Sequence, residues 1–232
     1  MHNQVFENCL RIGNPIVQSY ALLEESEITL IDGGFFGDSP TRIADALKEA
    51  GRSLEEVTTI LLSHGHIDHT LHIRELVNRT GASVCAPLLD RNQIAGTHRY
   101  RGVSRICGWL EMLARIRYDY QPPRVVHWFD DGDIIPVWGG LKVVSLPGHT
   151  PGHCAFYSEN HRLLFANDLF ANLYGIPKCP PFWFNADNRE MRRSLVKADQ
   201  LDLSGGVLVN HSNSRDRQQL RRDLAKLASR VK

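Results

Sequence analysis

The sequence predicts an α/β or α+β protein whose strands pair largely antiparallel. Segments with apolar residues at helical spacing alternate along the chain with short β-branched and apolar runs, so helices and strands are mixed. Between residues 125 and 166 several strand-like segments follow one another closely, with glycine-containing turns at 131–132 and 139–140. Such a run favours antiparallel pairing over a doubly wound sheet. Because no linker interrupts the pattern, we expect residues 1–232 to form a single domain.

The first expected strand covers residues 28–32, an apolar run that ends at a pair of glycines. A helix follows it, because Asp38 or Ser39 can cap an N-terminus and Pro40 suits a first helical turn. Gly51 is placed to end this helix.

The next strand, 58–62, is β-branched and apolar and is therefore expected to be buried. It runs directly into the polar segment 63–69. A helix to about Asn78 and a strand near 83–85 come next. The stretch 102–118 is expected to be helical from the spacing of its apolar residues.

The second half of the chain is expected to be richer in strands. The strand-like segments are 125–128, 133–135, 141–145, 154–157, 163–166 and 207–209. A helix over about 188–200 precedes the last of these strands. A final amphipathic helix carries Leu220, Leu224 and Leu227 on one face.

The composition is that of an ordinary globular protein, and 232 residues are enough to bury a sizeable core. The net charge of +1 argues against bulk attraction to nucleic acid or an anionic membrane, so we expect neither as a partner. Residues 1–9 lack the features of a signal peptide, and no apolar run approaches the roughly 20 residues of a membrane helix. We expect a cytoplasmic protein. The five scattered cysteines are expected to be free and mostly buried.

Four candidate metal ligands lie within six residues, immediately after the buried strand 58–62. They are His64, His66, Asp68 and His69. Residues two apart in an extended chain point the same way, so His64 and His66 can hold one ion. The turn that follows lets Asp68 and His69 face a second position. Imidazole suits zinc, iron and manganese, and the added carboxylate indicates a hydrolytic metal site.

Three further candidate ligands follow strand-like segments in the second half of the chain. They are His149, Asp168 and His211. Ligands placed at strand ends converge on one edge of a sheet, so we expect all seven side chains to meet there.

These motifs together resemble the metallo-β-lactamase superfamily. The resemblance rests on HxHxDH at 64–69, PGHTPGH at 147–153, an aspartate after LLF, a late histidine and LIDGG at 30–34. All five motifs occur in the family's order, and they extend from about residue 10 to 212. The resemblance implies an α+β fold, a four-layer αβ/βα sandwich with mostly mixed or antiparallel sheets and with the metals at one edge.

The resemblance also implies a ligand set for two divalent ions. It places His64, His66 and His149 on the first ion, and Asp68, His69 and His211 on the second, with Asp168 bridging them. Asp32 is then structural and ties the loops of the site together. Zinc is the first choice of metal, with iron and manganese as alternatives.

The chemistry that follows is hydrolysis by a hydroxide shared between ions about 3.5–4 Å apart, because bound metal lowers the pKa of water to about 7. We assign Asp68 a second role as proton shuttle to the leaving group. The sequence departs from the usual pattern at Thr70-Leu71-His72, at Asn167, where a glycine is common, and at Asn210 and Ser212. Asparagine tolerates the left-handed conformation better than most residues.

Several features are open to more than one interpretation. We interpret His72 as a surface or packing residue rather than as part of the site. For His153, a hydrogen bond near the site and a purely structural role agree equally well with the sequence. Segment 91–124 has seven arginines against two acidic residues, and it is either a pocket wall, a solvated helix face or a subunit contact in a homodimer. The aromatic stretch 170–184 is expected to form a substrate lid, with Tyr174 as a hydrogen-bond donor to the carbonyl or leaving group.

The sequence therefore predicts a binuclear metal-dependent hydrolase of a small carbonyl substrate, which is a lactone, thioester, ester or amide. Lactones and thioesters rank above β-lactams because no export signal is visible. The alternatives are a β-lactam-hydrolysing enzyme and a non-catalytic, metal-containing sensor or binding protein of the same fold.

Overall fold

The computed structural model describes residues 3–14 and 16–231. Its strands are β1 (Gln4–Phe6), β2 (Cys9–Gly13), β3 (Gln18–Leu23), β4 (Ile28–Ile31), β5 (Val57–Leu61), β6 (Ser83–Pro87), β7 (Val125–Phe129), β8 (Ile134–Ile135), β9 (Leu141–Ser145), β10 (Cys154–Ser158), β11 (Leu163–Leu173), β12 (Ile176–Lys178) and β13 (Gly206–Ser212). Its α-helices are α1 (Ser39–Glu49), α2 (Ile67–Thr70), α3 (Ile73–Thr80), α4 (Arg91–Ile94), α5 (Arg105–Arg117), α6 (Asn188–Asp199) and α7 (Arg217–Ser229). Short 3-10 helices are η1 (Leu54–Glu56), η2 (Leu88–Asp90) and η3 (Gly102–Ser104).

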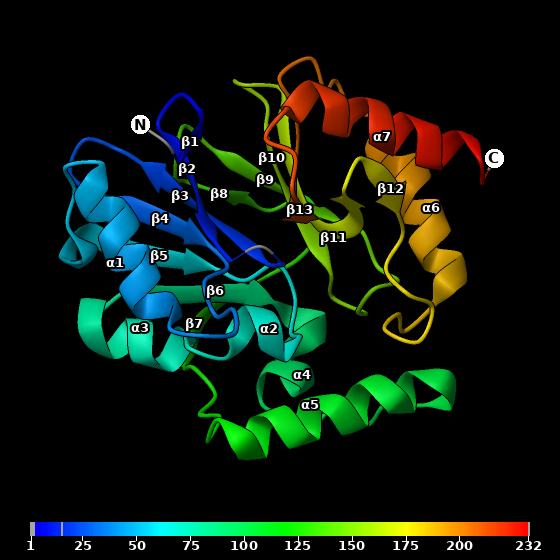
Figure 1. Cartoon of the computed structure of the whole chain (residues 1–232), viewed down its shortest axis with the longest axis horizontal. Helices are drawn as coiled ribbons and strands as arrows, with labels where there is room; N and C mark the ends of the chain where they lie inside the picture. The colour runs from blue at the N-terminus through cyan, green and yellow to red at the C-terminus, as the bar shows by residue number, and fades with distance from the viewer. Residues whose placement is uncertain (1–2, 15, 232) are drawn as a thin grey trace.

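The strands form two mixed sheets (Figure 1). The first has the order β1-β2-β3-β4-β5-β6-β7, with antiparallel pairing from β1 to β4 and parallel pairing from β4 to β7. The second has the order β12-β11-β10-β9-β8, all antiparallel, and β13 pairs parallel with β11. The predicted mixture of antiparallel and parallel pairing is confirmed.

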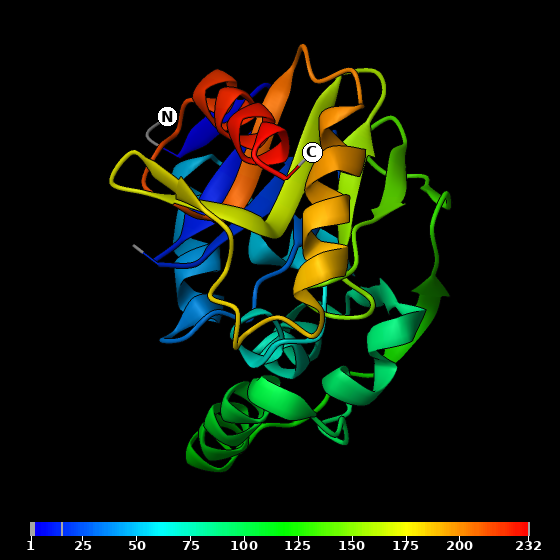
Figure 2. The ribbon, with the colours of Figure 1, turned by 90° about the vertical axis from the view of Figure 1, so that its right-hand side faces the viewer.

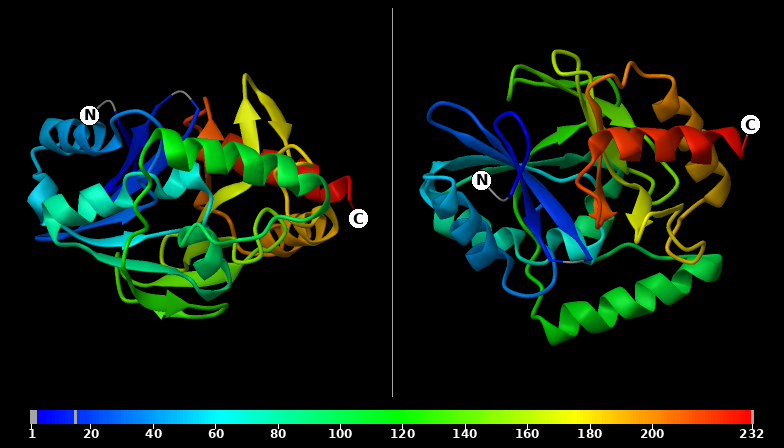
Figure 3. Two further views of the ribbon diagram at one scale, coloured as in Figure 1. Left: turned by 90° about the horizontal axis from the view of Figure 1, so that it is seen from below. Right: turned by 45° about the horizontal axis from the view of Figure 1, so that its top comes forward.

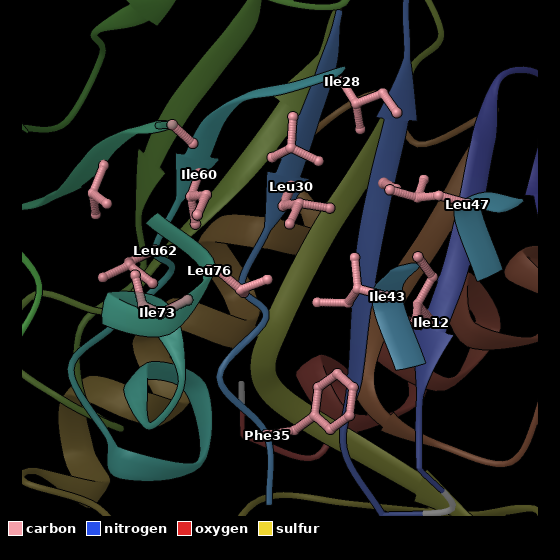
Figure 4. Close-up of a cluster of buried hydrophobic side chains, with 14 of the residues drawn as sticks. Ile12, Ile28, Leu30, Phe35, Ile43, Leu47, Ile60, Leu62, Ile73 and Leu76 are labelled. Carbon is pink, nitrogen blue, oxygen red and sulfur yellow. The ribbon is translucent and has the colours of Figure 1, made fainter. Parts of the chain in front are cut away.

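Each sheet has helices on its outer face. Apolar side chains of α1 and α3 pack against β4 and β5 in one buried cluster, shown in Figure 4. On the far side of the molecule, α6 and α7 pack against β10, β11 and β13 in a second cluster. Figure 2 shows these two helices lying on the second sheet. The order helix, sheet, sheet, helix is the four-layer αβ/βα sandwich that the sequence predicted.

A third buried cluster joins the inner faces of the two sheets. Ile31 and Leu61 of the first sheet meet Phe156 and Phe165 of the second there. Leu30 belongs instead to the helix-facing cluster, because successive residues of a strand point to opposite faces. The alternation sends side chains of β4 and β5 to both cores, so these strands pack against the helices on one side and the second sheet on the other.

Helix α5 lies outside the four layers, across the end of the sandwich where α2 begins (Figures 1 and 3). The predicted helix over 102–118 is thus present as η3 followed by α5. The helix expected to run to about Asn78 is divided into α2 and α3. Strands β1, β2, β3 and β12 were not expected, and β11 continues well beyond the predicted 163–166.

Four of the five cysteines are buried and Cys179 is exposed, all as free thiols, as predicted. Among the described residues, no helix combines the length and the apolar character that a membrane crossing requires. The cytoplasmic location stays a prediction.

Candidate metal centre

The predicted ligands come from both sheets. His64 follows the end of β5, and His66 directly precedes α2, which carries Asp68 and His69. His149 lies in the connection between β9 and β10. Asp168 and His211 lie within β11 and β13 rather than after strand ends.

An irregularity in β11 positions the carboxylate of Asp168. The register between β11 and β13 shifts on both sides of Asn167, whose φ is 51°. Such a bulge bends a strand and re-aims a side chain. The left-handed conformation expected at Asn167 is confirmed, and an asparagine there keeps the geometry that a glycine would otherwise provide.

Three imidazoles gather on one side of Asp168. The ligand atoms of His64, His66 and His149 lie within 4.8 Å of one another, and all three side chains are buried. Nδ1 of His66 is 2.9 Å from Nε2 of His149. This is the trio predicted for the first ion.

A second group lies on the other side. One ligand atom each from Asp68, His69 and His211 falls within the same 4.8 Å limit. Oδ2 of Asp168 is 3.0 Å from Nε2 of His211 and 3.4 Å from Nε2 of His69. The same oxygen is 3.4 Å from Nε2 of His149, so Asp168 stands between the two groups.

The outer ring nitrogens of four histidines are engaged away from the centre. The contacts of Nδ1 are His64 to Ser63 Oγ at 2.9 Å, His69 to Asp32 Oδ2 at 3.1 Å, His149 to Asn185 Oδ1 at 3.0 Å, and His211 to the carbonyl oxygen of Ile16 at 2.7 Å. We assign the N–H to Nδ1 in each ring, since each partner can accept a hydrogen bond. The Nε2 lone pairs then face inward, as metal ligands require.

Three inward-facing atoms have no hydrogen-bond partner among the described residues. They are Nε2 of His64, Nε2 of His69 and Oδ1 of Asp168, all fully buried. Buried polar groups are nearly always hydrogen-bonded, so orphaned nitrogen and oxygen atoms grouped together call for a cation. Imidazole with carboxylate is a donor set that zinc, iron and manganese accept. The residues present therefore fit a metal centre.

The electrostatics of the centre favour a positive charge. Burial lowers the pKa of His69, but the carboxylates of Asp168 and Asp68 outweigh it and hold that pKa well above its usual value. Burial also lowers the pKa of His211, and Asp168 again raises it overall. Burial dominates at His64, where it holds the pKa well below its usual value. Bound metal would take the place of the protons that Asp168 draws to the site.

Two buried carboxylates hold the loops of the centre. Asp32 accepts hydrogen bonds from the backbone N–H and the hydroxyl of Ser63 at 2.9 and 2.8 Å, and from Nδ2 of Asn210 at 2.7 Å. Its predicted structural role is confirmed.

Asp90, which the sequence did not single out, joins the segments that carry His64 and His149. It accepts from the N–H of Gly65 at 2.9 Å, the hydroxyl of Thr150 at 2.6 Å and the N–H of Gly152 at 2.6 Å. Burial raises its pKa to about 6.

The two histidines whose roles the sequence left open, His72 and His153, lie in different surroundings. Burial lowers the pKa of His153 to about 4, and its Nε2 accepts the backbone N–H of Asp168 at 3.2 Å. The hydrogen bond near the site that was considered for His153 is confirmed. His72 instead lies beside Glu75 in the first turn of α3, with 3.5 Å between Nδ1 and Oε2. It belongs to the packing of that helix, the interpretation that the sequence favoured.

A cavity of about 530 Å³ opens over the centre. Its polar floor includes His66, Asp68, His149, Asp168 and His211. Its walls come from α2, α5, β11 and the segment 178–184, so Phe170 and Phe184 of the aromatic stretch line the cavity, whereas a substrate lid stays a prediction. Segment 91–124 forms one wall through Cys107, Leu110, Glu111 and Ala114 of α5, and none of its arginines lines the cavity.

Tyr174 is the predicted site residue that the structure leaves outside. It occupies the turn between β11 and β12 with φ of 57°, its side chain is 88% exposed, and it is not among the residues that line the cavity. The extension of β11 carries this turn away from the floor of the cavity. We therefore assign Tyr174 no part in the chemistry below.

Comparison with known proteins points to one family. The sequence model of the Metallo-beta-lactamase superfamily matches residues 12–204. The probable metallo-hydrolase YflN of Bacillus subtilis is 24% identical over 228 residues, which is 90% of this chain and 84% of that protein. A hydroxyacylglutathione hydrolase of Methylobacterium nodulans is 31% identical over 175 residues, 73% of this chain. The match spans only 54% of that hydrolase, so about half of its length is covered.

Solved structures show the same fold. A metallo-beta-lactamase family protein from Thermus thermophilus superposes with a TM-score of 0.77 at 21% identity, covering 98% of this chain and 80% of that one. The subclass B3 metallo-beta-lactamase MEM-A1, from a soil metagenome library, has a TM-score of 0.69 at 20% identity over 98% of this chain and 92% of its own. At these identities the likeness concerns the fold alone.

Proposed function

This chain belongs to the metallo-β-lactamase superfamily, and on that premise we propose that it is a hydrolase that binds two divalent metal ions and cleaves a small carbonyl substrate with water. The observation that carries the proposal is the convergence of the seven predicted ligands, five of which line the floor of one cavity, while three of their buried ligand atoms have no hydrogen-bond partner. A structural role alone does not explain so many unpaired buried groups.

The ligand set divides between two positions. His64, His66 and His149 would hold one ion. Asp68, His69 and His211 would hold the other, and Asp168 would contact both. When bound, such a pair of ions provides water of lowered pKa, about 7, and polarises the carbonyl that is to be cleaved.

The chain's own residues would provide proton transfer and a suitable environment for the reaction. Asp68 lines the cavity, and its side chain is 25% exposed, unlike the buried Asp168. A carboxylate that reaches both the centre and the cavity can carry a proton to the departing group. The apolar side chains that line the cavity lower the local dielectric constant beside the centre, which strengthens electrostatic interactions there.

We rank lactones and thioesters first among the substrates, then other esters and amides, and β-lactams after them. Two relatives named hydroxyacylglutathione hydrolase are 31% and 28% identical to this chain over the matched residues. The likeness to β-lactamases is one of fold at about 20% identity. Zinc is the first choice of metal, because the site is rich in imidazole, which zinc accepts together with carboxylate.

A turnover screen tests the proposal. Purified protein, stripped of metal and reloaded with zinc, manganese or iron, is assayed on lactones, thioesters, simple esters and β-lactams, and its metal content is measured in parallel. We expect two ions per chain and metal-dependent cleavage of a lactone or thioester. A protein that holds metal and binds such compounds tightly, yet turns over none of them with any metal, would instead be a sensor of the same fold.

A further inference from the structure

We propose that the cavity beside the metal centre is a subsite for an unbranched aliphatic acyl chain, so that the substrate is a fatty-acyl compound and not one with a polar acyl group. The inference rests on the proposed hydrolytic function, because the same cavity contains the ligands. It goes beyond that function by naming the acyl part of the substrate.

The first observation is the chemistry of the walls. Leu110 and Ala114, one turn apart on α5, line one wall together with the buried Cys107. Phe170 and Leu173 of β11 line the cavity as well. The segment after β12 adds Cys179, Pro180, Pro181 and Phe184. Side chains from three separate parts of the sequence thus present an apolar surface to the same space.

The second observation is what the charged wall residues do. Besides the predicted ligands, the charged residues that line the cavity in the described part of the chain are Glu111 and Lys178. Glu111 accepts hydrogen bonds from the N–H of Ile67 at 3.1 Å and from the hydroxyl of Tyr100 at 2.6 Å. Oε2 of Glu111 also lies 3.3 Å from a guanidinium nitrogen of Arg115.

The carboxylate of Glu111 therefore already has three partners within the protein. Lys178 belongs to β12, where its side chain is exposed. A polar acyl group would lose its hydration against the apolar side chains that make up most of these walls, which is costly. An alkyl chain loses nothing there and is favoured by burial.

The third observation is continuity with the reacting position. Asp68, Asp168 and His149 line the same cavity as the apolar side chains. A carbonyl placed at these residues lies in the same cavity as the apolar side chains of α5 and β11, so its acyl chain can reach them. Chain length then sets binding energy, since each buried methylene contributes about 0.8 kcal/mol, the equivalent of about fourfold in kcat/KM.

The first experiment measures kcat/KM of the metal-loaded protein for p-nitrophenyl esters and acyl thioesters from acetyl to dodecanoyl. We expect a rise of about fourfold for each added methylene until the chain fills the cavity, and no gain after that. Hydrolysis that is indifferent to chain length, or fastest with acetyl, overturns the subsite and leaves the hydrolytic function intact.

The variant Ala114→Phe fills the cavity from α5. It is expected to lower kcat/KM for the decanoyl ester relative to the acetyl ester by at least about tenfold, the equivalent of two buried methylenes. Met112→Phe adds a larger side chain on the outer face of the same helix, where Met112 is exposed and does not line the cavity. This control should behave as the unaltered protein does. Leu110→Gln, which makes the wall polar at a half-exposed position, gives a second test if Ala114→Phe does not fold.

A binding measurement separates the subsite from catalysis. Calorimetry with straight-chain alkanols from hexanol to decanol, on metal-free protein, needs neither a carbonyl nor turnover. We expect one site whose Kd tightens about fourfold per methylene and that Ala114→Phe removes but Met112→Phe retains. Alkanol binding of this kind without any hydrolysis contradicts the proposed function alone. Binding that is absent, or equal in both variants, contradicts the subsite.

Discussion

At the scale of single residues, the ligands and the residues that hold them differ in how far the sequence reveals them. His64, His66, Asp68 and His69 are conspicuous because their spacing after a buried strand has a direct geometric meaning. His149, Asp168 and His211 acquired roles through the resemblance to a family. Asp90 escaped notice, because the donors that it accepts from lie 25 to 62 residues away in the chain. Glu111 escaped notice as well, because its contact with the loop of the ligands is to Ile67, 44 residues away.

Replacing His66 tests the ligand set. His66 is buried and its Nδ1 faces His149 within the first group. We expect His66→Ala to lose metal and activity together while the fold persists. The variant removes one of the three ligands of the first ion, but the loop keeps its backbone contacts. Metal content and circular dichroism measure the two effects. His127→Ala, at an exposed histidine of β7, should change neither. Full activity in His66→Ala would refute the ligand assignment.

Replacing Asp90 tests the support for two ligand loops. Asp90→Ala leaves three buried donors, those of Gly65, Thr150 and Gly152, without their acceptor. We expect a loss of about 2–4 kcal/mol in the free energy of unfolding, since each unsatisfied buried group costs on the order of 1–3 kcal/mol before relaxation. Metal affinity should fall as well, because His64 and His149 flank these donors.

Urea denaturation and zinc titration measure both quantities. Asp45→Ala, at an exposed carboxylate of α1, is the matched control and should stay within about 0.5 kcal/mol of the original protein. Equal stability of the two variants would mean that the hydrogen bonds to Asp90 are not needed to hold the loops.

At the scale of elements, the strands that were not predicted, or were predicted too short, have physical explanations. β11 was expected to stop at 166 because Asn167 and Asp168 interrupt its apolar run, although the strand continues to Leu173. Functional polar residues break the local pattern where they enter a strand. β3 is buried on both faces and therefore shows no alternation of period two. The position of Tyr174 relative to the cavity could not be predicted from the sequence, because the direction of its turn depends on the length of β11.

The packing of α6 against the loop of His149 sets a further test. The N–H of Asp187 donates to the carbonyl of Gly148 at 2.9 Å, and that of Ala186 to the carbonyl of His149 at 3.0 Å. Gly148 has φ of 128°, and a Cβ there would overlap the backbone of Met191 in the first turn of α6.

We expect Gly148→Ala to lose about 2–4 kcal/mol, because a strained conformation costs about 1–3 kcal/mol and overpacking adds a similar amount. Gly37→Ala separates the two effects. Gly37 also has a positive φ, of 96°, but a Cβ there meets nothing within 4 Å, so its variant should lose only about 1–2 kcal/mol. Chemical denaturation measures both variants, and equal losses would show that the contact with α6 is unimportant.

Helix α5 was identified from its apolar spacing, yet much of that apolar surface faces outward. Ile106 is 56% exposed and Trp109 is 58% exposed. The homodimer considered from the sequence stays a prediction. Light scattering decides it, because the chain has a mass of 26.3 kDa and a dimer has twice that.

At the scale of the whole molecule, the four-layer arrangement followed from the family resemblance and not from the periodicities, which left an α/β class open. The apolar periodicities show which face of each helix or strand is buried, but they do not show which of these faces pack against one another. The inner surfaces of the two sheets join through residues as distant in sequence as Ile31 and Phe165. Their contact brings the loop after β5 over β11 and β13, and only this meeting of the two sheets assembles the centre.

The origin of the ligands predicts that metal stabilises the entire fold. Four of the ligands lie directly after strand β5 of the first sheet, namely His64, His66, Asp68 and His69. Asp168 and His211 belong to strands of the second sheet. An ion bound to both groups links the sheets and binds only the folded chain. At a free zinc concentration about one hundred times Kd, this linkage adds about 2.7 kcal/mol. For a chain of this size we expect Tm to rise by roughly 5–10 °C.

Thermal unfolding of chelator-treated protein, with and without added zinc, measures the effect. Magnesium at the same concentration should raise Tm little, because it prefers oxygen ligands and an octahedral shell to imidazole. The His66→Ala variant should respond to zinc much less than the original protein does. If zinc left Tm unchanged in the original protein at saturating occupancy, the ions would bind folded and unfolded chains alike, and the seven side chains would not act as one preformed site across the two sheets.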